Sequence, residues 1–374
     1  FWATGVTYRV NGRIAVTNGA TLTIAPGAVV VGAGPGSYLV VERDANINAV
    51  GSQGAPIIMT SGGAPGSQFP GDWGGLVIHG KAVANCAGIT GCGLTSVVGD
   101  CESEGGAGFF GGSDDDDDSG ELRFVRVEYA GQEISPNNEL NAFTFNAQGT
   151  GTTLQYLQAH RGTDDLFEWF GGASRSSYFV GTGGDDDGLD WQMGFRGVHQ
   201  FAVIVATDQD GANGDKGIEA DNNEFDFSCP GESNARMANL TLIGSPLTAN
   251  GIHLRRGTNG GIFNSIIVDW VSTGFRMQHD ETFDNGVGAQ PGLFSPASGG
   301  VSFDGNILFG NNGGGDQYDQ TPYGTLNQTT EQFVTANFTN NRIVDPLLDP
   351  TYDNVDGVWR PQAGSPALFD NNAA

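Results

Sequence analysis

The chain has 374 residues, and 43 aspartates and glutamates oppose 16 lysines and arginines, which gives a formal charge of −27. So acidic a surface repels nucleic acids and anionic membranes, and the composition therefore excludes both as partners. No stretch approaches the ~20 consecutive apolar residues of a transmembrane helix, so we expect no transmembrane segment.

The N-terminal region consists of short runs in which apolar and polar residues alternate. Each run is followed by an Asn-Gly, Pro-Gly or other glycine-rich turn, and this alternation is typical of half-buried strands. Three short strands and three turns, repeated about every 20–30 residues, describe one coil of a β-solenoid. The expected strands are Thr7–Val10, Arg13–Val16, Thr21–Ile24, 28–31, Tyr38–Val41, 46–49 and 56–59.

Residues 81–120 interrupt this pattern. The segment is rich in glycine, and it contains three of the four cysteines and the run of five aspartates at 114–118. A solenoid tolerates such growth because each turn is a surface loop on an unchanged core. We therefore predict a large Gly/Asp-rich loop insertion at 81–120.

Alternation then resumes, and no run shows the i, i+3, i+4, i+7 periodicity of an amphipathic helix. The later expected strands are 122–129, 153–158, 202–205, 238–243 and 261–268. An antiparallel sandwich would also contain many short strands, but it favours regular two-residue turns, whereas the turns here vary in length. The sequence therefore predicts one all-β solenoid domain over residues 1–374, with an irregular capping region at 310–374 that blocks edge pairing.

Acidic residues gather at turns in the middle of the chain. Carboxylates crowded on tight loops repel one another, and a hard divalent cation with a preference for oxygen ligands, usually calcium, relieves that repulsion. The run at 114–118 is a weaker candidate, because five consecutive acids cannot all face one ion; its alternative is a solvated loop. We predict that calcium is the bound cofactor, held by residues drawn from Asp164, Asp165, Asp185, Asp186, Asp187, Asp190, Asp208, Asp210, Asp215, Glu219 and Asp221.

The spacing of these acids leaves a catalytic alternative open. With a coil repeat of about 22 residues, Asp164 and Asp165 would stack on the acids at 185–190, either as a linear calcium site or as the carboxylate pair of a glycosidase. A polysaccharide lyase would add a basic residue near an anionic substrate, which a chain of charge −27 suits poorly. We favour calcium and a structural role, with Arg255 and Arg256 as counter-charge. The candidate basic residues for a lyase are Arg161, Arg196, Lys216, Arg255 and Arg256, with His160 and His253 near them in sequence.

A set of aromatic residues has two interpretations. Aromatic side chains on a solenoid can stack on sugar rings, and they can also fill the core. Because side chains alternate along a strand, Trp169 and its two neighbours face opposite ways, so at least some of the set is core. The set comprises Trp73, Phe167, Trp169, Phe170, Trp191 and Phe195.

The cysteines are even in number, and none has the CxxC spacing of a zinc site. In an acidic, lysine-poor chain that begins at Phe1 rather than Met, they predict disulfides, an oxidising compartment and a leader that has been removed. Buried free thiols are the alternative. The four residues Cys86, Cys92, Cys101 and Cys229 allow three pairings, and spacing alone leaves all three open.

Several segments, in order, carry a family resemblance. They are 19–27, 71–78 (Gly-Asp-Trp-Gly-Gly-Leu-Val-Ile), 119–131, 164–172 (Asp-Asp-Leu-Phe-Glu-Trp-Phe-Gly-Gly), 217–222 and 361–367. Together they resemble a widespread family of exported bacterial right-handed parallel β-helix proteins, often anchored as surface lipoproteins or carried with sorting tails. The resemblance covers almost the whole chain and implies the fold and an extracellular or outer-surface location, but little chemistry.

The resemblance also bears on the cysteines. In such proteins a pair like Cys86 and Cys101 recurs around the insertion, the second just before a Glu-x-Glu-Gly-Gly like that at 102–106. Cys92 and Cys229 look like additions in this chain. A bond between them would pin the insertion to a distant coil.

The expected function is that of an exported calcium-binding β-helix protein with a structural or adhesive role at the cell surface or in the extracellular matrix. The alternative is a calcium-dependent polysaccharide-active enzyme, either a lyase or a glycoside hydrolase. Besides calcium, the candidate partners are surface polysaccharide or second copies stacked head to tail into a filament. The alternative to the filament is a surface-anchored monomer whose leader covers the N-terminal end. Little chain precedes Thr7–Val10 to cap the first coil, whereas four prolines between 345 and 372 block strand addition at the other end.

Overall fold

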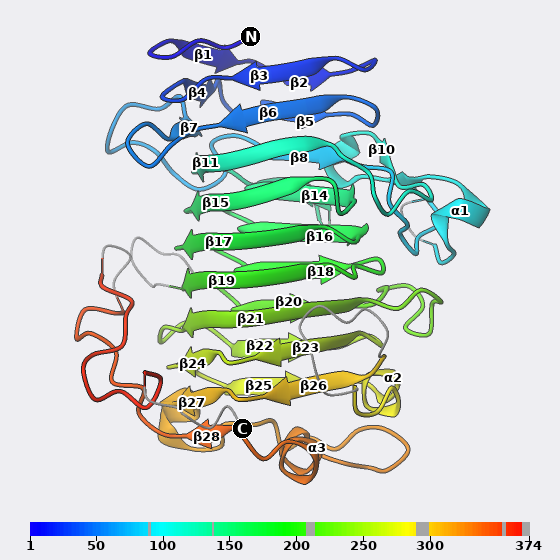
Figure 1. Ribbon diagram of the computed structural model, residues 1–374, viewed down its shortest axis with the longest axis vertical. Coiled ribbons are helices and arrows are strands. Elements are labelled where there is room, and N and C mark those ends of the chain that lie inside the picture. The colour runs from blue at the N-terminus through cyan, green and yellow to red at the C-terminus, as the bar shows by residue number, and fades with distance from the viewer. Residues whose placement is uncertain (89–90, 137, 207–213, 289–298, 354–356, 369–374) are drawn as a thin grey trace.

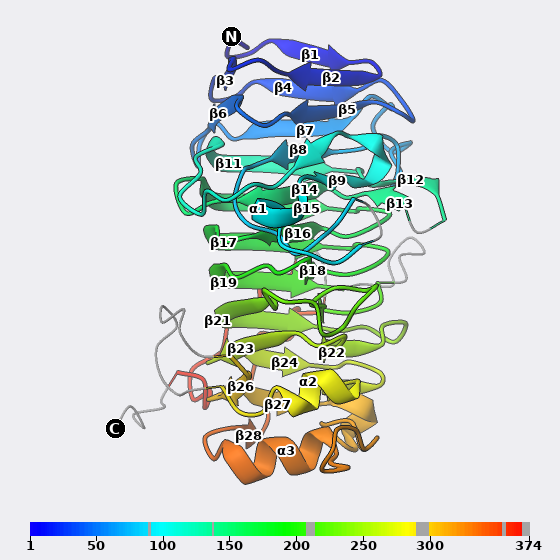
Figure 2. The ribbon, with the colours of Figure 1, turned by 90° about the vertical axis from the view of Figure 1, so that its right-hand side faces the viewer.

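The computed structural model describes residues 1–88, 91–136, 138–206, 214–288, 299–353 and 357–368. In these residues, parallel strands stack coil upon coil along one axis, from the N-terminal coil at the top of Figure 1 to the helix α3 (Thr330–Asn337) and the strand β28 (Arg342–Ile343) at its bottom. Figure 2 shows the same stack from the side. The predicted parallel β-helix is confirmed. No described helix has the length and apolarity that crossing a membrane requires.

One face of the β-helix is a parallel sheet of nine strands among the described residues. Every residue of the central strands β14 and β16 is buried. Polar and apolar residues alternate only in strands that have one face in water. The search for alternation in the sequence therefore did not identify β14 and β16. In spatial order the sheet comprises β2 (Arg13–Val16), β5 (Tyr38–Val41), β8 (Leu76–His79), β14 (Phe143–Gln148), β16 (Phe167–Gly172), β18 (Leu189–Gln192), β20 (Ile218–Ala220), β22 (Asn250–Leu254) and β25 (Thr273–Met277).

The other two faces belong to a second sheet, which has fifteen strands in the described part of the chain. Its long strands bend in the middle and contribute to both faces; β11, for example, pairs with β6 before its bend and with β7 after it. The long strands are β11 (Gly120–Glu128), β15 (Thr153–His160), β17 (Arg175–Thr182), β19 (Val198–Val205) and β21 (Asn234–Ile243). The others are β1 (Thr7–Val10), β3 (Thr21–Ile24), β4 (Val29–Gly32), β6 (Asn46–Val50), β7 (Ile57–Ser61), β23 (Asn259–Phe263), β24 (Ile266–Val268), β26 (Val301–Asp304), β27 (Ile307–Phe309) and β28 (Arg342–Ile343).

Apolar side chains from both sheets fill the interior and stack from coil to coil. The rings of Phe143 and Phe167 lie 5.2 Å apart, and those of Trp169 and Phe195 lie 5.3 Å apart. Burying one large apolar side chain contributes about 1.5–3 kcal/mol, so this column supplies much of the driving force for folding. Of the aromatic set considered above for sugar binding, five members pack in this interior and Phe170 packs beneath the insertion, so the set is core.

The insertion between β8 and β11 covers part of the outer face of the nine-stranded sheet. It lies at the right of Figure 1 and across the front of Figure 2. Phe110 of the insertion packs against Phe170 and Met193 of the sheet side in a second apolar cluster. The insertion contains α1 (Thr95–Val98), β9 (Cys101–Glu102), η1 (Glu104–Gly106) and β10 (Phe109–Phe110), and a hairpin of β12 (Gln132–Ser135) and β13 (Asn138–Leu140) follows β11.

The run of aspartates at 114–118 is held more firmly than a solvated loop would be. Asp115 forms an ion pair with Arg196 at 2.9 Å, and Asp117 is buried with its Oδ1 3.4 Å from the ammonium of Lys81. The first contact connects the end of the insertion to the body of the β-helix, and the second joins the two ends of the insertion.

The two ends of the β-helix differ. At the N-terminal end, β1 and β2 each pair with one neighbouring strand among the described residues. At the C-terminal end, the helix α3 (Thr330–Asn337) closes the interior with Phe333, Val334 and Phe338. This helix lies in the region predicted to be irregular, so that prediction was wrong for these residues. The sequence feature that marks the start of the helix is a capping box, in which the side chains of Thr329 and Gln332 each accept a hydrogen bond from the other residue's backbone N–H. The remaining short helices are α2 (Asp280–Asp284) and η3 (Asn311–Gly314).

Candidate metal centre

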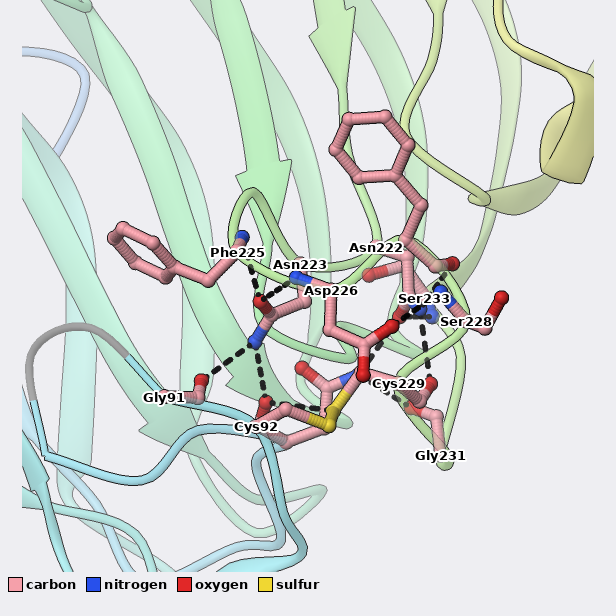
Figure 3. The surroundings of a disulfide bond; sticks show 12 residues. Gly91, Cys92, Asn222, Asn223, Phe225, Asp226, Ser228, Cys229, Gly231 and Ser233 are labelled. Atoms are coloured by element: carbon pink, nitrogen blue, oxygen red, sulfur yellow. Dashed lines mark hydrogen bonds between the residues drawn. A yellow bond between two sulfur atoms is a disulfide. The ribbon is translucent and has the colours of Figure 1, made fainter.

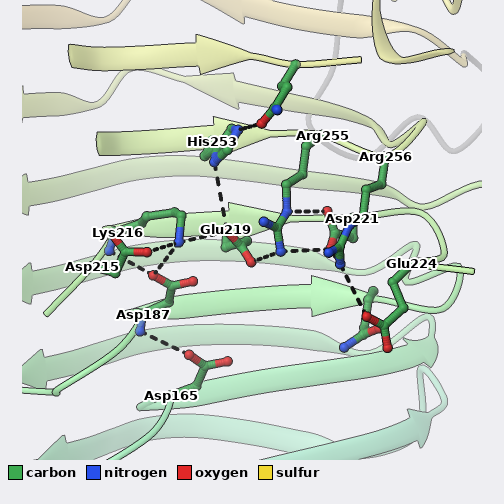
Figure 4. A network of polar contacts seen from close by, with 12 residues as sticks. Asp165, Asp187, Asp215, Lys216, Glu219, Asp221, Glu224, His253, Arg255 and Arg256 are labelled. Atoms are coloured by element: carbon green, nitrogen blue, oxygen red, sulfur yellow. Dashed lines mark hydrogen bonds and ion pairs between the residues drawn. The ribbon is translucent and has the colours of Figure 1, made fainter. Parts of the chain in front are cut away.

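Three successive coils of the nine-stranded sheet carry charged side chains at the same place. The sheet register sets Glu168 beside Asp190, and Asp190 beside Glu219. Three residues before each of these comes a further charged residue, in order Asp165, Asp187 and Lys216. We call the five carboxylates of Asp165, Glu168, Asp187, Asp190 and Glu219 the acid ladder, part of which is drawn in Figure 4.

Backbone hydrogen bonds tie one rung of the ladder to the next. The N–H of Asp187 donates to Oδ1 of Asp165 at 3.0 Å, and the N–H of Lys216 donates to Oδ1 of Asp187 at 2.7 Å. Asp165 and Asp187 are 22 residues apart, which confirms the coil repeat on which the predicted stacking rested. The coil turns therefore hold these carboxylates in place.

Lys216 neutralises the ladder near its C-terminal end. Its ammonium lies 2.8 Å from Oε1 of Glu219 and 3.6 Å from Oδ1 of Asp187. Burial alone would lower the pKa of Lys216, but the carboxylates of Asp187 and Glu219 outweigh burial and raise that pKa. The ammonium therefore stays charged at all ordinary pH values.

Two arginines complete the counter-charge at this end. Arg255 forms ion pairs with both Glu219 and Asp221, and Arg256 lies 2.8 Å from Asp221 and 3.5 Å from Glu224 (Figure 4). The interpretation of Arg255 and Arg256 as counter-charge is therefore confirmed.

The N-terminal half of the ladder has a different electrostatic environment. The charges that act most strongly on the Glu168 carboxyl are those of Glu104, Asp190 and Asp164, all of them acidic. Burial first, and then this repulsion, raises the pKa of Glu168 well above its usual value; burial and neighbouring acids do the same for Asp165. Ionised together, these carboxylates would repel one another where little water screens them.

Buried oxygen atoms in this half have no hydrogen-bond partner among the described residues. Asp190 is only 8% exposed, and its Oδ1 is one such atom. Asn141 Oδ1 and Gln192 Oε1 are two others. A buried polar atom without a partner costs about 1–3 kcal/mol, and more when it is charged. All three atoms are acceptors, and a cation at Asp190 would satisfy its Oδ1 and relieve the repulsion at the same time.

Carboxylate oxygens also lie close enough together to share a cation. In each of three trios, one oxygen from each residue lies within 4.8 Å of the others: Asp164, Asp165 and Asp186; Asp165, Asp187 and Asp190; and Asp186, Asp187 and Asp215. An all-oxygen donor set suits calcium or magnesium, whereas protein zinc sites favour Cys and His. Calcium accepts the more variable ligand number and geometry of the two, so the residues fit the predicted ion.

Most of these acids were predicted from the sequence, and the structure sorts them into groups. Glu219 and Asp221 already have basic partners, while Asp185 lies in the same turn as Asp186. Asp208 and Asp210 lie outside the described residues. The structure therefore concentrates the uncompensated charge on the acids of β16, β18 and the turns that precede them.

Two acids of the centre were missed. Glu104 comes from the insertion and acts on Glu168, a contact that no local pattern reveals. Glu168 had a signal, because Asp165 and Glu168 repeat the spacing of Asp187 and Asp190 one coil later.

Three further residues considered for catalysis, Arg196, His160 and His253, make contacts with other side chains. Arg196 pairs with Asp115 of the insertion, and His160 Nδ1 lies 2.8 Å from the Thr182 hydroxyl. His253 hydrogen-bonds to Gln278 at 2.8 Å, and burial followed by nearby basic groups lowers its pKa to about 2. A group with so low a pKa is a poor proton acceptor at neutral pH.

Both disulfides form, and the bond between Cys86 and Cys101 is the one that the resemblance implied. Cys86 bonds to Cys101 and Cys92 bonds to Cys229, with sequence separations of 15 and 137. Around the second bond, the side-chain amide of Asn223 donates to the carbonyl oxygens of Asn85 at 2.7 Å and of Gly91 at 3.1 Å (Figure 3). The insertion is therefore pinned to the loop that follows β20, which carries Glu224 of the polar network.

Comparisons with known proteins agree with the fold. A family model described as a pectate-lyase-like β-helix domain matches residues 1–295. Among solved structures, rice weevil pectin methyl esterase is similar over 82% of this chain and 81% of its own, with 11% identity and a TM-score of 0.27. An identity and a TM-score this low carry no argument about the fold or the chemistry of this chain, and the agreement rests on the family model. No curated protein matches the chain.

Proposed function

The chain belongs to the pectate-lyase-like β-helix family, and we propose that it is an exported, calcium-binding member with a structural or adhesive role outside the cell. At least one calcium ion would be held by the ladder acids Asp165, Asp187 and Asp190, together with Asp164 and Asp186 beside them. When bound, calcium supplies positive charge and flexible oxygen coordination. The residues of the ladder keep their carboxylates in register across three coils.

The Asp190 carboxylate is the observation that supports this proposal most strongly. It is buried, it lies between Glu168 and Glu219 in the sheet, and its Oδ1 has no hydrogen-bond partner among the described residues. Native proteins rarely leave a buried carboxylate oxygen unpaired. A cation shared with Asp165 and Asp187 accounts for its position.

Burial of the ladder favours a structural ion over a catalytic one. Glu168 and Asp190 are 4% and 8% exposed, so a polymer chain does not reach them in this conformation. Lys216 and Arg255, the nearest basic residues, are ion-paired with ladder carboxylates. Neither is therefore available as a base, whereas an ion held here would join successive coils.

A calcium-dependent polysaccharide-active enzyme, a lyase or a glycoside hydrolase, is the second candidate. Family membership favours it, since the family is described by its likeness to pectate lyases. This activity would require the insertion to move away from the ladder, because the acids are buried as the chain now lies.

Calorimetric titration of chelator-treated protein with calcium chloride tests the proposal. We expect heat of binding, and a melting temperature several degrees lower in EDTA than in calcium. Asp190→Asn should weaken calcium binding by about tenfold or more. Asp44→Asn, whose side chain is 71% exposed and pairs with Lys81, is the matched control and should leave affinity unchanged.

The same preparations separate the two candidates. Absence of binding heat, together with identical melting in calcium and EDTA, would contradict calcium binding. Formation of new chain ends from polygalacturonate, dependent on calcium and abolished by Asp190→Asn, would instead favour the enzyme.

Head-to-tail filaments are a further part of the proposal. β1 and β2 pair on one side only among the described residues, and calcium would reduce the repulsion between acidic copies. Electron microscopy with and without calcium tests this; particles that stay monomeric in both conditions would exclude it.

A further inference from the structure

A second feature, on the sheet away from the acid ladder, is a row of half-exposed aromatic rings. Phe124, Tyr156, Tyr178 and Phe201 occupy equivalent bends of β11, β15, β17 and β19, which can be located in Figure 1. Neighbouring ring centroids lie 4.5, 4.6 and 5.0 Å apart, with interplanar angles of 3°, 2° and 6°. We call these four residues the aromatic ridge.

The backbone at the ridge is unfavourable for aromatic residues. The four φ angles lie between 50° and 64°, in the left-handed region that bulky side chains rarely adopt. In the next two coils, Asn239 and Asn264 occupy the same bend and bond to each other through their side chains at 2.5 Å. Asparagine tolerates this conformation better, so the bend itself does not require aromatic residues.

Stacking offsets only part of that conformational disadvantage. Tyr156, Tyr178 and Phe201 remain 39%, 43% and 42% exposed, and apolar surface left in water contributes nothing to stability. Exposed aromatic residues gathered in one place typically mark a binding surface. The ridge is therefore better explained by a ligand than by the fold.

A groove of about 460 Å³ runs along the ridge. This volume lies within the range of small-molecule sites, about 300–1,000 Å³. Gln158, Asn239 and Thr241 contribute polar groups to its lining, and Val180 and Val203 contribute apolar ones. None of the residues that line the groove is charged, although the chain as a whole carries −27.

The chemistry of this groove selects among possible occupants. Because the rings stack face to face, their edges and the two tyrosine hydroxyls meet the ligand. Ring edges carry partial positive charge and favour electronegative atoms, whereas the surrounding negative charge repels anionic polymers. An uncharged polymer rich in hydroxyl oxygens satisfies both conditions.

A second copy of the chain fits less well. An aromatic side chain buries roughly 150–250 Å² in total, so four rings that are already partly covered offer far less than the ~1,200–2,000 Å² of a stable protein interface. Two strongly acidic chains would also repel each other. By contrast, an extended glycan presents one sugar at intervals close to the ~4.7–4.9 Å separation of neighbouring strands.

We infer that the aromatic ridge and its groove bind a neutral polysaccharide that lies along the axis of the β-helix. The Tyr156 and Tyr178 hydroxyls, Gln158 and Asn239 would hydrogen-bond to sugar hydroxyls. This inference does not rest on calcium binding, because the groove contains no residue of the acid ladder.

Titration calorimetry with hexamers of β-1,4-linked glucose, xylose and mannose, in EDTA and in calcium, tests the inference. Hexagalacturonate is the anionic comparison. We expect at least one neutral hexamer to bind equally in both conditions and hexagalacturonate to bind at least tenfold more weakly. The variant Tyr156→Asn/Tyr178→Asn, which copies the asparagines of the later coils, should lose at least tenfold in affinity and keep its melting temperature.

Phe69→Ser, which alters an exposed aromatic residue elsewhere, should bind like the parent. The single variant Tyr178→Asn gives the same comparison if the double variant folds poorly. The inference is overturned if all neutral hexamers fail to bind, if binding survives in the double variant, or if hexagalacturonate binds best. A dimer in light scattering that the double variant abolishes would assign the ridge to a second copy instead.

Discussion

Asp187 and Lys216, which lie in consecutive coils, are joined twice. The backbone N–H of Lys216 donates to Oδ1 of Asp187 at 2.7 Å, and the Lys216 ammonium lies 3.6 Å from the same oxygen. One residue thus closes the turn and neutralises the acid beside it. Asp187 is therefore neutralised by a lysine from the next coil.

Replacing this lysine should be far more harmful than replacing the other lysine of the chain. Lys216→Met leaves Asp187 and Glu219 buried without their ammonium, and breaking a buried ion pair costs about 3–5 kcal/mol. Lys81→Met removes an ammonium that pairs with the exposed Asp44 and lies 3.4 Å from the buried Asp117; because the lysine side chain is 38% exposed, water screens this charge and we expect the smaller loss. Urea unfolding of the two variants measures the difference, and equal losses would refute the assigned role of Lys216.

Asp190→Asn should change stability in opposite directions with and without calcium. In EDTA, the substitution replaces a buried acid, whose pKa burial and then Glu219 raise well above its usual value, with a group that never ionises; we therefore expect it to stabilise the protein. In saturating calcium the same substitution removes a ligand and should destabilise it. Melting curves of parent and variant in both buffers give the two signs; the same sign in both would mean that no cation binds at Asp190.

The two disulfides should contribute unequally to stability. In the chain-entropy model, a bond that closes 15 residues contributes about 3 kcal/mol, and one that closes 137 residues contributes about 5 kcal/mol. We therefore expect Cys92→Ser/Cys229→Ser to melt at a lower temperature than Cys86→Ser/Cys101→Ser. Mass spectrometry of the unreduced parent should find no alkylatable thiol; four such thiols would exclude both bonds.

The buried His199 should make the protein sensitive to acid. Burial lowers its pKa to about 3 from the ordinary 6.5, so between these values the unfolded chain binds a proton that the native state does not. Stability is therefore lost as pH falls below 6.5. His199→Met, which copies Met237 at the same register in the next coil, should remove this loss.

The size of the effect follows from linkage. Between pH 6.5 and 5, the parent should lose about 2 kcal/mol relative to His199→Met. Ser176→Ala keeps the histidine but removes its 2.7 Å contact with Nδ1, so this control should retain the pH dependence of the parent. If the free energy of unfolding changes equally with pH in the parent and in His199→Met, His199 does not titrate as its burial implies.

Much of the fold was predictable because its signals are local. Alternating runs such as Thr21–Ile24, followed by glycine-rich turns, identified strands wherever one face of a sheet meets water. Alternation did not identify β14 and β16, because both of their faces are buried. The core covers the inner face, and the insertion and the polar network cover the outer face. A strand buried on both sides shows no alternation.

Half of the candidate site was predictable for a related reason. The 22-residue interval between Asp165 and Asp187 stacks them whatever the rest of the chain does, since a β-helix brings equivalent positions of successive coils together. Glu104 could not be placed in this way. It belongs to an insertion whose path depends on packing and on two disulfides rather than on the coil repeat.

The amino-acid sequence by itself determined the coil architecture, the cluster of acids at the turns and the even set of cysteines, because periodicity and turn residues act over a few neighbouring positions. Only the tertiary structure decided which carboxylates are neutralised. Lys216 and Arg255 reach acids in other coils, across loops of unequal length, whereas the charges that act most strongly on Glu168 are those of other carboxylates. It also placed four aromatic rings in one exposed row, since residues 124, 156, 178 and 201 become neighbours only when the coils stack.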